Sequence, residues 1–445
     1  MATKYLQLSS KVTGPILTSE DEGYAQEIAG FNTATVHSPD VVVVAQSASD
    51  VVEAIRYAAH LYYTVTVQCT GHGAIEPITS GMLITTHNLN NLSIDPQTRT
   101  ATIGAGVRWG AVIIEAAKYG LAPITGSSPN VGVVGFLIGG GVGPLARSHG
   151  FGSDYVRSFT VATGAGDLVQ ASADENPDLF WALRGGKIGF GIVTESKVRL
   201  VELPKLYGGN IFYEEDNIEA ALRAWITWTA TADPKVTTSA FLVNFPPLDL
   251  LPPPLRGRRL LNLRFAYPGD AQRGAELAAP FYSFAPVYMG SIEDLPPNKI
   301  ARIHNDPTTP APSWVRGMML GPIDQDFATV LLQAIGKGTN PPFMGVEIRH
   351  IGEATKHDVP EGSSVSGRGA DYTMGVLATN PALFETEVPT AVAQLFNSVK
   401  QWAYPETNMN FVGHNGPYFV RTSSDEDFAK LDSIRKLYDP EGIFG

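Results

Sequence analysis

Residues 126–152 read GSSPNVGVVGFLIGGGVGPLARSHGFG, and this stretch decides how the rest of the chain is interpreted. It holds nine glycines around one apolar run, with a single arginine, Arg147, near its end. Glycine costs backbone entropy, so a dense cluster indicates positive φ angles or a close approach of the backbone to another group. A ligand such as a pyrophosphate supplies that reason, because exposed backbone N–H groups form concavities that bind anions. Tight turns between short strands are the alternative.

Two further glycine clusters favour the ligand interpretation. Gly71-His72-Gly73 lies upstream of the glycine stretch, and a second cluster runs downstream from Gly185-Gly186 to Gly191. Each cluster lies beside β-type sequence. We therefore predict one extended ligand that crosses three loops.

The composition is that of a globular protein with a large buried fraction. The chain has 445 residues, which predicts two or three domains, and it is 44% apolar but only 17% charged. The net charge of −12 disfavours nucleic acid as a partner. Cys69 is the single cysteine, which excludes an intrachain disulfide and is typical of a reducing compartment. No secretory signal and no membrane-spanning run is recognised, so we expect a soluble, cytoplasmic protein without a membrane partner.

The first unit we expect is a β-α-β unit that ends in the Gly-His-Gly turn. Residues 41–45 form an apolar run, Ser47-Ala-Ser-Asp50 can cap a helix over 51–60, and a second strand is expected over 64–67. That second strand delivers His72 into the glycine turn. The motif G-x-G-x-x-G does not occur there, so the ordinary dinucleotide fingerprint is absent.

The composition changes near Pro204, where we expect a second domain to begin. The segment that follows alternates as strands and amphipathic helices do. The strands are expected over residues 208–213, 238–244, 260–267 and 344–351, and one helix over 218–231. The chain then ends with a loop, a helix over 426–437 and Pro440, which stops it.

Several of these segments, taken in order, resemble one known family. The pattern comprises the Gly-His-Gly turn, SSPNVGV and GGGVG of the glycine stretch, SADENPDLFWALRGG at 172–186, GFGIVT at 189–194 and YDPEGIF at 438–444. In this order the pieces resemble the berberine-bridge-enzyme-like FAD-linked oxidases of the vanillyl-alcohol-oxidase-type flavoprotein superfamily. The resemblance covers residues 36–200 and 405–445, and between them it extends only to the fold.

The resemblance implies an α+β, two-domain PCMH-type FAD-binding fold with an antiparallel-sheet substrate domain. Residues 1–203 would begin the FAD-binding domain, 204–404 would form the substrate domain, and 405–445 would return to the FAD domain. The implied cofactor is FAD, with its ring at the domain junction, and we predict no metal site. The residues that the resemblance places at FAD are Thr70, Gly71, His72, Gly73, Ala74, Ser127, Ser128, Val131, Gly132, Gly135, Gly139, Gly140, Gly141, Gly143, Ile192, Val193, Asn410 and Phe411.

His72 matches the position at which the family attaches the flavin through a histidyl link. The alternative is a histidine that only hydrogen-bonds the loop. Ser128 stands where doubly tethered members carry a cysteine, and a hydroxyl is much less nucleophilic than a thiolate, so no cysteinyl link is expected. Lys187 replaces a small residue of the usual pattern. It is either a solvated surface residue or a cation that neutralises an FAD phosphate or a substrate carboxylate.

The implied activity is oxidation of a small molecule. An oxidase of this class moves hydride from an alcohol, sugar or specialised-metabolite substrate to the flavin, and the electrons then pass to dioxygen. A redox-neutral cyclase or isomerase with a structural FAD is the alternative, and a flavin-binding protein without catalysis is a third hypothesis.

The candidate catalytic residues are Tyr372, His357, Glu347 and Arg349. Glu347 and Arg349 share one face of a strand by the two-residue period, so they either face substrate or pair across the sheet. The family's chain crosses the flavin ring near Asn410, Phe411, His414 and Tyr418.

Overall fold

The computed structural model describes residues 3–414 and 423–444. Its N-terminal part holds a four-stranded sheet in the order β1-β2-β4-β3, in which β2, β4 and β3 are parallel. The strands are β1 (Ile16–Leu17), β2 (Val41–Val44), β3 (Val65–Gln68) and β4 (Met82–Thr85). The predicted crossover helix is α3 (Ala48–His60), and the side chain of Ser47 accepts from the N–H of Asp50 as its N-cap.

A five-stranded antiparallel sheet follows, in the order β5-β6-β10-β8-β9. Its strands are β5 (Leu92–Asp95), β6 (Thr100–Gly104), β8 (Val156–Ala162), β9 (Leu168–Ser172) and β10 (Ile192–Arg199). Helices α4 (Trp109–Ala117) and α7 (Pro177–Leu183) contribute apolar side chains to the same core as both sheets. The glycine-rich stretch runs between β7 (Leu121–Ala122) and β8, and it includes the short helices α5 (Val133–Leu137) and α6 (Ala146–His149).

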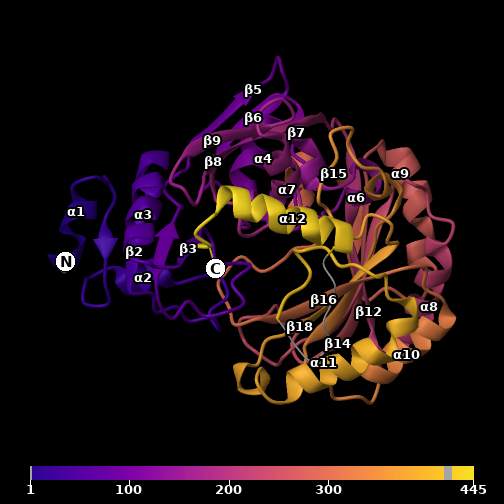
Figure 1. Ribbon diagram of the computed structural model, residues 1–445. Coiled ribbons are helices and arrows are strands. Elements are labelled where there is room, and N and C mark those ends of the chain that lie inside the picture. The colour runs from indigo at the N-terminus through magenta and orange to yellow at the C-terminus, as the bar shows by residue number, and fades with distance from the viewer. Residues whose placement is uncertain (1–2, 415–422, 445) are drawn as a thin grey trace.

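The second half of the chain is built on a seven-stranded antiparallel sheet in the order β15-β12-β14-β13-β17-β18-β16. One face carries the apolar side chains and is covered by α8 (Ile218–Thr229), α10 (Gln325–Ile335) and α11 (Glu387–Ser398), which lie along its outer side (Figure 1). The strands are β12 (Leu206–Glu214), β13 (Thr237–Asn244), β14 (Arg259–Tyr267), β15 (Met289–Leu295), β16 (Trp314–Leu320), β17 (Gly345–His350) and β18 (Tyr372–Ala378).

The C-terminal helix α12 (Asp425–Tyr438) packs back on the first half of the chain. It lies beside α7 in Figure 1, and the ammonium of Lys430 lies 3.7 Å from the centre of the Trp181 ring. Beyond it, Ile443 accepts a 2.7 Å hydrogen bond from the N–H of Val65 in β3. The chain around Gly413 instead lies at the edge of the large sheet, where Gly413 forms an isolated antiparallel β-bridge with Arg316 of β16.

The remaining elements are short or peripheral. They are α1 (Leu6–Ser9), α2 (Tyr24–Ile28), α9 (Ala271–Ala278), β11 (Val201–Glu202) and 3₁₀ turns η1 (Thr3–Tyr5), η2 (Gly152–Tyr155), η3 (Glu215–Asn217), η4 (Ala279–Tyr282), η5 (Pro297–Ile303), η6 (Glu353–Lys356), η7 (Pro381–Leu383) and η8 (Lys400–Trp402). Within the described residues, every helix is too short or too polar to cross a bilayer.

Candidate functional site

His72 lies in a tight turn directly after β3. Gly71 has a φ of +67°, and a Cβ there would collide with the Cα of Gly30, so the turn requires glycine. The imidazole of His72 stacks on the ring of Phe31, with centroids 3.7 Å apart, and its Nδ1 lies 2.9 Å from Oγ1 of Thr70. Its Nε2 is buried and has no hydrogen-bond partner among residues 3–414 and 423–444.

The same imidazole is neutral. Burial, and then the positive charge of Arg108, lower the pKa of His72 to about 4. A neutral ring with one free nitrogen is the form that a histidyl link to a flavin needs, because a protonated imidazole has no lone pair to bond with.

The glycine stretch lies against this turn. A Cβ on Gly132 would lie 3.3 Å from Sγ of Cys69, so the start of the stretch touches the strand end that carries His72. Gly140 and Gly141 have φ angles of +98° and +81°, as the density of glycines predicts. Ser128, at the position of the family's second tether, is buried, and its Oγ lies 3.4 Å from the N–H of Asn130.

The third glycine loop lies against the glycine stretch, because the N–H groups of Gly185 and Lys187 both donate to the carbonyl of Ile138. Gly185, Gly189 and Gly191 all have positive φ, and so does Lys187 at +64°. The ammonium of Lys187 donates to Oδ1 of Asn410 at 3.2 Å and lies 3.9 Å from where a Cβ on Gly73 would stand. The structure therefore brings together the Gly-His-Gly turn, the third loop and the segment around Asn410, which we call the crossing segment.

Asn410 also joins the crossing segment to the glycine stretch. Its Nδ2 donates a 2.8 Å hydrogen bond to the carbonyl of Phe136, and its side chain lies over Gly139. Ile192 and Val193 open β10 as buried residues paired with Ala162 and Val161 of β8.

The place where these loops meet fits an anionic dinucleotide. A Cβ on Gly135 would meet no heavy atom within 4 Å, and a Cβ on Gly73 would meet only Lys187, so both backbones face open space. Buried Thr125 Oγ1, like His72 Nε2, lacks a partner in the described part of the chain. Glycine backbones facing open space, free polar atoms and a lysine are the groups that hold a pyrophosphate.

Comparison with known proteins agrees with this geometry. Residues 39–172 match the family of the FAD binding domain. FAD is therefore the cofactor, as predicted, and the His72 turn and the glycine stretch both lie inside the matched range.

Relatives and structural neighbours extend the likeness. The chain is 36% identical to (R)-6-hydroxynicotine oxidase of Paenarthrobacter nicotinovorans over 196 residues, which cover 44% of this chain and 43% of that protein. The matched stretch thus spans less than half the length of that relative. Over 293 residues the chain is 29% identical to an FAD-linked oxidoreductase of Aspergillus terreus, which covers 63% of this chain and 57% of that protein.

Solved structures show the same fold over the whole chain. The BBE-like 1 protein of Physcomitrella patens matches with a TM-score of 0.85 at 18% identity, over 100% of this chain and 98% of the other. 6-Hydroxy-D-nicotine oxidase of Arthrobacter nicotinovorans matches with a TM-score of 0.83 at 22% identity, over 97% and 96% of the two chains. The predicted α+β fold and the predicted relation to the FAD-linked oxidases are confirmed.

A row of polar side chains crosses the large sheet on the face opposite the helices. Residues paired in register across antiparallel strands point to the same side. The row is formed by Ser291, Asn210, Arg264, Ser239, Arg349 and Thr373, each paired with the next. We call it the polar row. The polar row lies close to the segment around Asn410 and Phe411, because the Arg349 guanidinium lies 6.0 Å from the ring centre of Phe411.

Glu347 and Arg349 lie on this face, as the two-residue period predicts, and they pair with each other. Arg349 Nη2 lies 2.7 Å from Glu347 Oε2, and Arg264 Nη1 donates to the other carboxylate oxygen. Burial alone would raise the pKa of Glu347, but Arg349 and Arg264 lower it to about 2. Glu347 is therefore a fixed negative charge at neutral pH.

The structure places the other two candidates elsewhere. Tyr372 lies on the helix-covered face, where its hydroxyl bonds Thr229 Oγ1 at 2.8 Å and burial raises its pKa. His357 lies exposed beyond η6, and its carbonyl accepts from Arg368. His414 stacks on Trp314 at the sheet edge, and Tyr418 lies outside the described residues.

Sequence reasoning missed two members of this face. Arg264 is the one charged residue within the apolar run 260–267, a signal that could have marked it. His304 lies 3.8 Å from Glu347 Oε1, and neither ring nitrogen has a hydrogen-bond partner among the described residues. Burial, followed by Arg264 and Arg349, lowers its pKa to about 3, so this imidazole is neutral.

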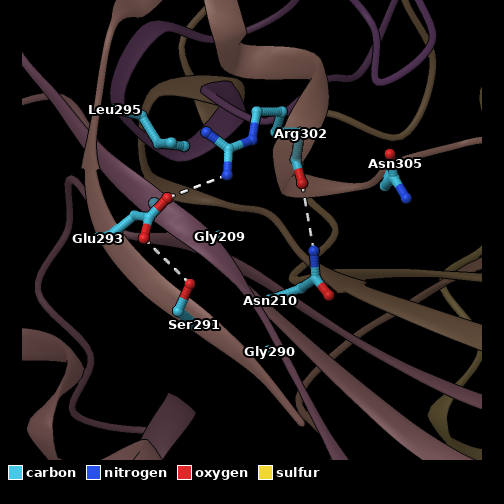
Figure 2. Close-up of a pocket in the computed structure, with 9 residues that line it drawn as sticks. Gly209, Asn210, Gly290, Ser291, Glu293, Leu295, Arg302 and Asn305 are labelled. Carbon is cyan, nitrogen blue, oxygen red and sulfur yellow. Dashed lines mark hydrogen bonds and ion pairs between the residues drawn. The ribbon is translucent and has the colours of Figure 1, made fainter. Parts of the chain in front are cut away.

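A pocket of about 230 Å³ opens at the β12–β15 edge of the same sheet. Figure 2 shows Glu293 between Ser291 and Arg302, with the amide of Asn210 turned to the carbonyl of Arg302. Its lining comes wholly from residues 208–305, so it includes none of the three glycine-rich loops. It meets the polar row at Ser291 and Asn210.

Proposed function

We propose that the protein is an FAD-linked oxidase of a small polar molecule. It would remove hydride from a C–H bond to the flavin while a proton leaves an O–H or N–H group, and dioxygen would take up the electrons as peroxide. Two adjacent residues carry the proposal: Asn410 contacts the FAD-side loops, while Phe411 contacts Arg349 on the polar row. Substrate held on the row would thus lie next to the cofactor.

In this proposal one domain binds FAD and the other binds substrate. We assign residues 1–203 and 405–445 to the FAD domain and 204–404 to the substrate domain. When bound, FAD supplies the two-electron acceptor. His72 would hold it through one histidyl link, and Ser128 would add none.

The polar row would bind and orient substrate. Glu347 is ionised and engaged by two arginines, so it fixes the position of Arg349 and Arg264 rather than accepting a proton. Neutral His304 can accept a hydrogen bond from a substrate hydroxyl or amine. Arg349 can donate one beneath Phe411.

The substrate class rests on the relatives. Hydroxynicotine oxidases are named for a cyclic amine, so cyclic amines join alcohols and sugars as candidates. We place the reaction in specialised metabolism and in the cytoplasm, the latter because a single cysteine is typical of a reducing compartment.

Anaerobic mixing tests the proposal. The purified yellow protein is mixed without oxygen with a panel of alcohols, sugars and cyclic amines while flavin absorbance is followed. An oxidase bleaches with its substrate and forms peroxide when air is admitted. Product that forms while the flavin stays oxidised would support the redox-neutral cyclase or isomerase instead. A protein that neither bleaches nor forms product with any compound would contradict the enzyme assignment.

A further inference from the structure

Lys187 combines two unfavourable features at one residue of the third glycine loop. Its φ of +64° lies in the left-handed region, which residues with a Cβ seldom adopt. The neighbours Gly185, Gly189 and Gly191 have positive φ as well, but as glycines they bear no such cost. A lysine kept at such a position needs a compensating interaction.

The protein itself supplies little compensation. The side chain is partly buried, and desolvation lowers the pKa of Lys187 to about 8. Its hydrogen-bond partner is the neutral amide oxygen of Asn410, and no carboxylate among the described residues pairs with it. A cation that is partly withdrawn from water and has no anionic partner is unfavourable.

The position of the ammonium indicates where the missing anion comes from. It lies between the backbone of Gly73, one residue after His72, and the side chain of Asn410, which covers Gly139. All three belong to loops that meet at the FAD site. Apart from the neighbouring residues His72 and Ala74, this ammonium is the one described group within 4 Å of a Cβ placed on Gly73.

We propose that Lys187 is the cation that pairs with an anionic group of the bound flavin cofactor. FAD offers two such groups, the pyrophosphate and the pyrimidine end of the reduced ring. The inference rests on FAD binding and not on the reaction proposed above. Lys187 is a positioning residue specific to this chain, since the family pattern has a small residue there.

Replacement by glycine makes a sharp test because it separates folding from cofactor binding. Lys187→Gly relieves the φ strain and removes a partly buried, unpaired charge, so the apoprotein should melt at a higher temperature. The same change should weaken binding of either the oxidised or the reduced cofactor at least tenfold, according to which anionic group Lys187 pairs with. A lysine that served only the fold would show the opposite effect on the melting temperature.

The measurements use the full chain with His72→Ala, so that FAD binds reversibly. Dissociation constants for FAD and riboflavin and the flavin midpoint potential are compared for the parent, Lys187→Gly and Lys187→Arg. Arg99→Gly is the matched control, since Arg99 is an exposed cation at φ +52° in the 96–99 turn, and its ion-pair partner among the described residues is the exposed Glu202.

The outcomes distinguish the two anions. If Lys187 pairs with the pyrophosphate, Lys187→Gly weakens FAD at least tenfold but leaves riboflavin within twofold. If it pairs with the reduced ring, oxidised FAD binds as before and the midpoint potential falls by about 30 mV for each tenfold loss of reduced-flavin affinity. Lys187→Arg keeps the positive charge, so its FAD affinity and midpoint potential should stay close to those of the parent. Arg99→Gly should change neither quantity. Unchanged affinities and an unchanged potential in Lys187→Gly would overturn the proposal.

Discussion

Arg147 of the glycine stretch donates a 2.8 Å hydrogen bond from Nη1 to Nε2 of His350, the last residue of β17. The same nitrogen donates to the carbonyl of Ile351, and the backbone N–H of Arg147 donates to Thr237 Oγ1 of β13. The arginine is 5% exposed. It therefore fastens the glycine stretch to strands β13 and β17 of the large sheet.

Arg147→Met should loosen this junction. It leaves the His350 nitrogen and the Ile351 carbonyl without their donor, and an unsatisfied buried acceptor costs about 1–3 kcal/mol. Urea unfolding of the holoprotein should show that the free energy of unfolding falls by an amount in that range. Arg157→Met changes an exposed position of β8, and it should lower the free energy of unfolding by no more than about 0.5 kcal/mol. Equal losses in the two variants would argue against the junction.

Stability should fall as the pH drops below about 6.5. Burial lowers the pKa of six described histidines: His37, His72, His149, His304, His350 and His414. Because each folded pKa lies below the unfolded value, the stabilisation is complete above the unfolded pKa. It is lost as the pH falls toward the folded pKa, by at most about 1.4 kcal/mol per pH unit for each group. Urea midpoints at pH 7.5 and 5.5 check this, and equal midpoints would refute it.

Glu347 should titrate outside the working range of the enzyme. Its pKa of about 2 keeps it ionised, so the pH profile of kcat/KM should contain no ionisation from this residue. Glu347→Gln should raise KM and cost about 3 kcal/mol, because it leaves Arg264 and Arg349 underpaired. If the variant instead abolishes an ionisation between pH 5 and 8, Glu347 is the base.

Tyr372→Phe should leave turnover within twofold of wild type. The phenol lies in the helix-covered core, so the change removes one hydrogen bond to Thr229 and about 1 kcal/mol of stability. Steady-state kinetics and thermal melting measure both effects. A large drop in kcat without a change in KM would restore Tyr372 as a catalytic candidate.

His72 should carry the flavin covalently. Denatured wild-type protein should keep yellow fluorescence on a gel after acid treatment, whereas His72→Ala should release all of it. Ser128→Ala should leave the bound fraction unchanged, since no second tether is expected. Complete release of colour from the denatured wild-type protein would show that His72 only hydrogen-bonds the loop.

Local sequence predicted the elements whose determinants are local. Ser47 caps α3 as expected, and the positive φ angles at Gly71, Gly140 and Gly141 follow from glycine's lack of a side chain. Strands β12, β13, β14 and β17 lie where alternation placed them. The strands β16 and β18 stayed unassigned, because Gly317 and Gly375 interrupt the pattern and their pairing partners are distant in sequence.

The sequence by itself predicted one extended ligand across three loops, because dense glycines are a local property of each loop, and the resemblance of the ordered motifs to the FAD-linked oxidases identified that ligand as FAD. Only the tertiary structure decided which side of the large sheet each candidate faces. It set Arg349 with Glu347 on the polar row, Tyr372 in the opposite core, and Lys187 beside Asn410. Those positions depend on strand register and on contacts between residues more than a hundred apart, and such contacts leave no periodic trace in the chain.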